Sequence, residues 1–147
     1  MKKIVYIDMD GVIVDFKSGV DSLDNQQIQE YAGRYAKCPD IFSKMQPMEG
    51  ALDAVRRLSL EYDVYILSSP GWGNASAWSD KYNWVVAFLP EMKKRLILSS
   101  QKHLNRGDYL IDDRIANGSG KFKGEFIHFG ESNFPKWKEV LDYLLEV

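Results

Sequence analysis

Two aspartates one residue apart follow the first apolar run of this chain, in the segment IVYIDMDGVIVDF at residues 4–16. Because side chains alternate between the two faces of an extended chain, Asp8 and Asp10 point in roughly the same direction. Two neighbouring carboxylates repel each other unless a cation lies between them or one of them holds a proton. The pair therefore indicates a metal site or an acid–base site at the end of a strand.

Polar side chains also end or follow three later apolar runs. They are two hydroxyls, one ammonium group and a second pair of carboxylates: Ser68, Ser69, Lys102, Asp112 and Asp113. If the runs are parallel strands, their carboxyl ends meet at one edge of a sheet, where ligand sites of α/β folds lie. That edge would combine the groups needed to hold a divalent cation and a phosphate.

Carboxylates of this kind suit a hard cation. Mg²⁺ prefers oxygen ligands, so Asp8, Asp113 and the main-chain carbonyl of Asp10 are candidate ligands. A bound cation would offset the repulsion between the carboxylates and let an anionic phosphate approach an anionic nucleophile.

The remaining groups suit phosphate binding. The hydroxyls of Ser68 and Ser69 can donate hydrogen bonds to phosphate oxygens, and Lys102 can place a positive charge against the transferring group. Gly11 permits close backbone approach and unusual dihedral angles just after the first acid pair.

Five short apolar runs predict the strands that carry these groups: residues 3–8, 62–68, 95–99, 108–112 and 125–129. The first three show little polar alternation, as expected for strands covered on both faces. Helical patterns lie between and after the strands, at 51–62, at 84–89 behind a polar loop, and at 135–147. This alternation predicts a parallel sheet with helices on both faces.

Residues 17–46 interrupt the alternation with a polar, helix-compatible stretch and a turn. The segment is too long for an ordinary connection, and inserts of this size beside a site are commonly lids. A length of 147 residues suits one main core. We therefore expect a single domain over residues 1–147, with a core formed by 1–16 and 47–147 and a small cap at about 17–46.

Composition narrows the class of protein and its partners. A formal net charge of −2 and a pI near 5.7 provide no broad basic surface, so we expect no binding of extended nucleic acid. The single cysteine, Cys38, forms no internal disulfide, which fits a reducing compartment or a fold that needs no disulfide. No segment approaches the roughly 20 apolar residues that cross a bilayer. We therefore expect a cytoplasmic protein with no membrane partner.

Taken together, these residues resemble the motif set of the haloacid dehalogenase superfamily of phosphotransferases. DMDGV resembles its first motif, ILSS its second, Lys102 its third and IDD its fourth. Five segments further resemble one branch, the 5'(3')-deoxyribonucleotidases, in family order: DMDGVIVDF, PMEGALDAVRRL, YILSSP, DKYNWV and GDYLIDDR. The match covers most of residues 3–114.

The resemblance implies a three-layer, Rossmann-like α/β fold, with a five-stranded parallel sheet in the order 3-2-1-4-5 and a small helical cap after the first strand. It also implies a Mg²⁺-dependent phosphoric monoester hydrolase that acts on (deoxy)ribonucleoside monophosphates, which are small-molecule substrates. Asp8 would attack phosphorus and form an aspartyl-phosphate, while Asp10 would act first as general acid and then as general base.

The resemblance also assigns the residues around this centre. Asp113, rather than its neighbour Asp112, is the expected direct metal ligand beside Asp8 and Asp10, and Asp112 and Gly11 support the site.

Two phenylalanines are expected near the nucleoside. Phe16, just past the first motif, would stack near the base or sugar, and Phe42 in the insert is our expected contact from the cap. The insert before PMEG is shorter than in typical relatives.

Two alternative functions fit some of the same residues. A short cap closes less surface around a nucleoside, so another small phosphate ester is an alternative substrate for the same chemistry. A phospho-accepting signalling module, such as a receiver domain, also combines an acid pair, a hydroxyl and a lysine on a parallel sheet. In a receiver, however, the phosphorylated aspartate lies on a later strand than the acid pair. Monomer and homodimer are both compatible with the sequence.

Overall fold

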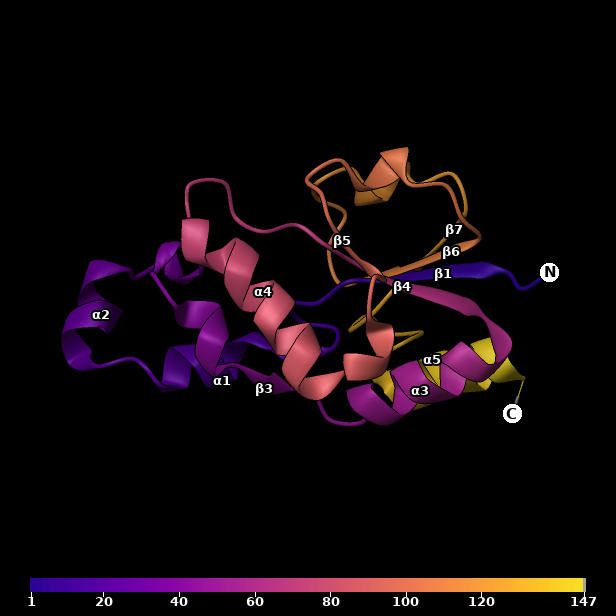
Figure 1. The fold of residues 1–147 in the computed structure, drawn as a ribbon, viewed down its shortest axis with the longest axis horizontal. Coiled ribbons are helices and arrows are strands. Elements are labelled where there is room, and N and C mark those ends of the chain that lie inside the picture. The colour runs from indigo at the N-terminus through magenta and orange to yellow at the C-terminus, as the bar shows by residue number, and fades with distance from the viewer. Residues whose placement is uncertain (147) are drawn as a thin grey trace.

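The computed structural model describes residues 1–146 and has a five-stranded parallel sheet at its centre (Figure 1). The spatial order is β5-β4-β1-β6-β7, with β1 (Ile4–Ile7), β4 (Asp63–Ser68), β5 (Leu96–Leu98), β6 (Tyr109–Asp112) and β7 (Glu125–His128). Counted along the chain among themselves, these strands have the predicted order 3-2-1-4-5. Ile7 of β1 lies opposite Ile66 of β4 and Ile111 of β6. The carboxyl ends of the strands therefore meet at one edge, as the sequence predicts.

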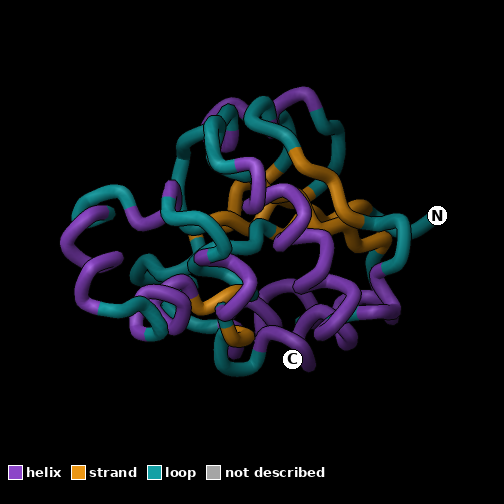
Figure 2. Tube along the Cα trace, turned by 60° about the vertical axis from the view of Figure 1, so that its left-hand side comes forward, coloured by secondary structure: helices purple, strands orange, loops and turns teal. Residues whose placement is uncertain are grey.

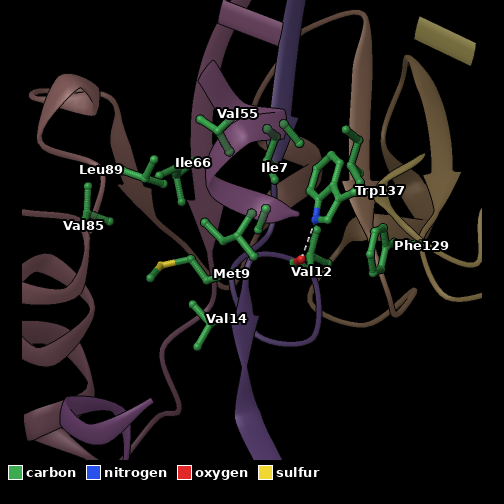
Figure 3. Close-up of a cluster of buried hydrophobic side chains, with 14 of the residues drawn as sticks. Ile7, Met9, Val12, Val14, Val55, Ile66, Val85, Leu89, Phe129 and Trp137 are labelled. Atoms are coloured by element: carbon green, nitrogen blue, oxygen red, sulfur yellow. Dashed lines mark hydrogen bonds between the residues drawn. The ribbon is translucent and has the colours of Figure 1, made fainter. Parts of the chain in front are cut away.

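Three α-helices pack on one face of the sheet: α3 (Ala51–Glu61), α4 (Ala75–Phe88) and α5 (Trp137–Leu145). Their apolar side chains contact alternate strand residues such as Val5 and Ile7. α3 and α5 pack against each other below the sheet in Figure 1. The indole Nε1 of Trp137 donates a 2.8 Å hydrogen bond to the carbonyl of Val12, as Figure 3 shows. This buried bond ties α5 to the segment that follows the first acid pair.

The second face of the sheet carries short 3-10 turns in place of α-helices. Its apolar side chains, from the alternate strand positions, form a smaller cluster with Phe122: Tyr6, Leu67 and Leu110. Phe122 follows η5 (Ser119–Lys121), which lies above the sheet in Figure 1, and η4 (Lys102–Leu104) precedes β6. Helices were expected on both faces, but the glycine-rich connection after β6 disfavours a long helix there.

The insert, residues 17–46, is flanked by a two-stranded antiparallel sheet in which β2 (Val14–Asp15) pairs with β3 (Gln46–Pro47). Between these strands lie α1 (Phe16–Asp21), α2 (Asn25–Glu30), η1 (Tyr35–Lys37) and η2 (Ile41–Lys44). A capping box between Asp24 and Gln27 begins α2. The insert occupies the end of the molecule away from the N-terminus, and Figure 2 shows it as short helices joined by loops.

Helix α4 begins earlier than its sequence pattern predicts. We expected a polar loop before Trp84, but the helix starts at Ala75. Buried Ala77, Lys81, Trp84 and Val85 follow the i, i+4, i+7, i+8 spacing of one helix face. Lysine is almost never fully buried unless it is paired, so a lysine in this stripe hides the pattern. The correction matters because it places Lys81 beneath the candidate site.

The helices of the described residues are short. The longest, α4, has 14 residues, and no helix within residues 1–146 has the length and apolar character needed to cross a membrane.

Candidate active site

Lys102 lies between carboxylates from two neighbouring strands. It is 3% exposed, and its Nζ donates hydrogen bonds of 2.7 Å to Oδ1 of Asp8 and 2.8 Å to Oδ2 of Asp112. Asp8 follows β1 and Asp112 ends β6, and these strands pair in the sheet. Lys102 reaches them from η4, where its main-chain amide donates to the carbonyl of Asn117. The sheet and the η4 turn thus bring three of the predicted residues together.

Burial is the largest single influence on the pKa of Asp8 and of Asp112, but the net shifts have opposite directions. Burial raises the pKa of Asp8 well above the usual value; Lys102 opposes this rise, and the charges of Asp112 and Asp10 add to it. Burial also acts to raise the pKa of Asp112, but Lys102 and a 2.6 Å hydrogen bond from the Ser119 hydroxyl bring that pKa below its usual range. Protein donors therefore satisfy Asp112 well, which suits the supporting role expected for it.

Asp113 presents an oxygen that no donor of the described residues satisfies. Its Oδ1 is buried without a hydrogen-bond partner, and burial, reinforced by Asp112, raises the pKa of Asp113. One carboxylate oxygen each from Asp8, Asp112 and Asp113 lies within 4.8 Å of the others. The other oxygen of Asp113, Oδ2, lies against Gly11, where a Cβ would overlap it. Hard oxygen ligands around an unpartnered carboxylate oxygen fit a divalent cation such as Mg²⁺.

A second buried lysine contacts Asp10, although no motif assigned it a role. Lys81 of α4 donates hydrogen bonds of 2.8 Å to Oδ2 of Asp10 and 2.6 Å to Oγ of Ser68. The other oxygen of Asp10, Oδ1, is buried and has no partner among the described residues. Two signals in the sequence could have singled out Lys81: the helical spacing of α4 and its place in the family-like segment DKYNWV.

The two serines at the end of β4 have different surroundings. Ser68 is fully buried, and its hydroxyl accepts the hydrogen bond from Lys81. The Ser69 hydroxyl donates a 2.9 Å hydrogen bond to the carbonyl of Ser99, and Ser69 lines the cavity described next. Both serines lie near the acid pair, but only Ser69 forms part of the cavity wall.

An open cavity of about 410 Å³ lies beside these residues. Its walls include acidic, hydroxyl, aromatic and basic side chains: Asp10, Phe42, Ser69, Trp72 and Arg114. Phe42 comes from the insert, and Phe16 packs edge-on against it with ring centres 5.9 Å apart. Phe42 therefore lies at the cavity, whereas Phe16 packs against Phe42 and is not one of the wall residues.

A larger cavity elsewhere in the protein is not the candidate site. A hollow of about 890 Å³ lies where β1 begins, near both ends of the chain, and its walls include Lys2, Arg57 and Tyr109. None of the predicted chemical residues lines it, so the smaller cavity beside Asp10 is the candidate substrate pocket.

Comparison with known proteins identifies the family. Residues 18–141 match the family model described as "5' nucleotidase, deoxy (Pyrimidine), cytosolic type C protein". A protein of Vibrio phage KVP40, named "Putative 5'(3')-deoxyribonucleotidase", is 54% identical over 144 residues, covering 97% of this chain and 85% of that protein. This chain belongs to the 5'(3')-deoxyribonucleotidase family. The human cytosolic 5'(3')-deoxyribonucleotidase is 28% identical over 167 residues, covering 93% of this chain and 78% of the human protein.

Solved structures share the fold of this deoxyribonucleotidase. The "putative HAD-hydrolase YfnB" of Bacillus subtilis, in a form bound to magnesium, has a TM-score of 0.70 at 13% identity, covering 99% of each chain. A hydrolase from Pseudomonas syringae has a TM-score of 0.60 at 13% identity, covering 100% of this chain and 99% of that one. The α/β fold of the haloacid dehalogenase superfamily is thus confirmed. Its family makes the chain a phosphoric monoester hydrolase of nucleotides.

Gly11 offers a test of the contact with Asp113. Gly11 has a φ of +80°, so a side chain there would be strained and would displace the Asp113 carboxylate. We expect Gly11→Ala to lower the free energy of unfolding by about 1–3 kcal/mol and to remove most of the activity. Gly33→Ala is the matched control, because Gly33 has a φ of +78° and a Cβ added there would meet no atom within 4 Å. Thermal unfolding and steady-state assays would measure both effects; equal behaviour of the two variants would contradict the role of the contact.

Proposed function

We propose that this deoxyribonucleotidase is a Mg²⁺-dependent phosphatase that releases phosphate from (deoxy)ribonucleoside monophosphates through an aspartyl-phosphate on Asp8. One observation carries the proposal: carboxylates from two strands converge on Lys102 beside an open cavity with aromatic walls. Asp8 is the nucleophile in this proposal because it lies next to the lysine and next to the second acid, Asp10.

In the first step, an oxygen of the Asp8 carboxylate attacks phosphorus and the bond between phosphorus and the ester oxygen breaks. Asp10 donates a proton to that departing oxygen, so that the nucleoside leaves as a neutral alcohol. Lys102 stabilises the negative charge on the transferring phosphoryl group, and Ser69, which lines the cavity, would exchange its hydrogen bond to the Ser99 carbonyl for one to that group.

In the second step, Asp10 takes a proton from a water molecule as that water attacks phosphorus. The bond between phosphorus and Asp8 breaks, and inorganic phosphate and the free carboxylate are restored. The covalent intermediate replaces one difficult displacement by two easier ones.

Mg²⁺ fits the carboxylates of the site. Asp8 and Asp113, with the main-chain carbonyl of Asp10, would hold the ion, and the orphaned Oδ1 of Asp113 supports this assignment. When bound, the ion supplies positive charge that offsets the carboxylates and polarises the phosphate. Asp112 remains bonded to Lys102 and Ser119 and so keeps a supporting role.

The insert would act as the cap of a single domain. Its Phe42 forms part of the wall of the same cavity as Trp72, which is 85% exposed. An exposed aromatic face beside a phosphate site, such as that of Trp72, can stack on a nucleobase. Phe16 would act indirectly, because it packs on Phe42.

A substrate panel tests the proposal. Phosphate release would be measured for 5'- and 3'-deoxyribonucleotides, the matching ribonucleotides, a sugar phosphate and p-nitrophenyl phosphate, each with Mg²⁺ and with a chelator. We expect the highest kcat/KM for a deoxyribonucleotide, with activity lost on chelation and restored by Mg²⁺. Preference for the sugar phosphate would favour the alternative substrate, and no release from any ester would end the proposal.

Asp113→Asn tests the assignment of the metal ligand. Loss of one carboxylate should raise the Mg²⁺ concentration for half-maximal activity by about 10-fold or more, while the protein stays folded. The control is Asp53→Asn on α3, since Asp53 is exposed and belongs to no part of the site. An unchanged Mg²⁺ requirement in Asp113→Asn would show that Asp113 is not a ligand.

A further inference from the structure

Lys81 is an unusual residue for the inner face of a helix. It is 1% exposed and is one of the largest side chains that are fully buried in the described residues. The ammonium group has two hydrogen-bond acceptors, Oδ2 of Asp10 and Oγ of Ser68, and lies 4.7 Å from the centre of the Phe42 ring. Burying an ammonium group costs free energy unless it is paired and hydrogen-bonded, so an apolar residue would serve packing better.

Lys81 contacts only one of the two oxygens of the Asp10 carboxylate. Oδ2 accepts the hydrogen bond from Lys81, while Oδ1 is buried and has no partner among the described residues. The hydrogen bond from Lys81 therefore fixes the orientation of the Asp10 carboxylate. The Asp10 side chain is 24% exposed and lines the candidate substrate cavity, so the held carboxylate still reaches the cavity.

We propose that Lys81 is a positioning residue that fixes the Asp10 carboxylate for proton transfer. The inference rests on the proposed function, in which Asp10 is the general acid and base. As the bond from phosphorus to the ester oxygen breaks, the proton moves from the Asp10 carboxyl group to that oxygen. Lys81 keeps its own protons throughout and acts only through Asp10.

Phe42 completes the environment of Lys81. Its ring comes from η2 of the insert, is 3% exposed and covers the ammonium group in cation–π geometry. The same ring forms part of the cavity wall. Phe42 therefore keeps water from competing for Lys81, and the position of Asp10 depends on the insert as well as on the sheet.

Leaving-group dependence tests this role. p-Nitrophenolate departs as a stable anion and needs no proton, whereas a nucleoside alkoxide needs one. We expect Lys81→Met to lower kcat/KM for a deoxyribonucleotide on the order of 10²-fold and to change kcat/KM for p-nitrophenyl phosphate little. The ratio kcat/KM is the proper readout because it reports the steps up to leaving-group release. Equal losses for both esters would mean that Lys81 binds phosphate through Ser68 or only maintains the fold, and would overturn the inference.

A double-variant comparison gives an independent result. If Lys81 acts through Asp10, adding Lys81→Met to Asp10→Asn should cause no further loss of kcat/KM for the nucleotide. Losses that multiply would overturn the inference.

Lys81→Gln, which retains a donor, serves if Lys81→Met does not fold, and should show the same dependence on the leaving group. Circular dichroism would verify folding at the assay temperature. A wild-type enzyme inactive on every nucleotide would instead overturn the proposed function together with this inference.

Discussion

Asp8→Asn is expected to lower kcat for a nucleoside monophosphate by about 10⁴-fold or more, because it removes the proposed nucleophile. We expect no loss of stability from this change. Burial, and then the charges of Asp112 and Asp10, raise the pKa of Asp8 against the effect of Lys102, so an uncharged side chain of the same shape is tolerated there. Lys102 keeps Asp112 as its partner in the variant. A nearly inactive protein that unfolds no earlier than the wild type is the expected outcome.

Steady-state assays and thermal unfolding of Asp8→Asn would be compared with the surface control Asp53→Asn. Rapid acid quench of the wild type during turnover, followed by mass spectrometry, should place the phosphoryl group on residues 4–16, and Asp8→Asn should carry none. Turnover of Asp8→Asn within about 10-fold of the wild type, or a phosphoryl group on another segment, would contradict the assignment of the nucleophile.

Lys102→Met is expected to damage both stability and catalysis. Removing the ammonium group leaves Asp8 and Asp112 buried without their shared partner, and breaking a buried ion pair in this way costs about 3–5 kcal/mol. It also removes positive charge beside the transferring phosphoryl group, which should lower kcat by about 10²–10³-fold.

Denaturant unfolding and steady-state kinetics would separate the two effects of Lys102→Met. Adding Asp112→Asn should recover part of the lost stability, because it removes one unpaired charge, but should not recover activity. Lys123→Met is the control, since Lys123 is exposed on the connection that follows β6. A Lys102→Met variant with wild-type stability would show that the buried pairs contribute less than their geometry indicates.

Local patterns predicted much of this site. The alternation of an extended chain places Asp8 and Asp10 in one direction, and parallel strands bring Ser69 and Asp113 to the same edge. These predictions needed only the identity of the strands and the rule that their carboxyl ends meet. Lys102 was placed by its resemblance to the third motif of the superfamily, and its bonds to Asp8 and Asp112 agree with that placement.

The sequence was less informative where a residue is buried although residues of its type are usually exposed. The buried stripe of α4 includes a lysine, so its first part was expected to be a loop and Lys81 received no role. Ser119 lies in a glycine-rich connection, yet it is fully buried and bonded to Asp112. The residue type gives no sign of burial at either position, because each side chain is buried only through its hydrogen bonds to other polar groups of the site.

By itself, the amino-acid sequence determined which chemical groups meet at the carboxyl edge of a parallel sheet. Strands are recognised from short stretches of sequence, and the carboxyl ends of parallel strands lie at the same edge. Only the tertiary structure decided which of those groups bond to each other. Lys102 donates hydrogen bonds to Asp8 and Asp112, and Lys81 donates hydrogen bonds to Asp10 and Ser68. The physical reason is that a buried charge must find its partners in three dimensions, and its choice among several nearby carboxylates depends on packing that no local spacing records.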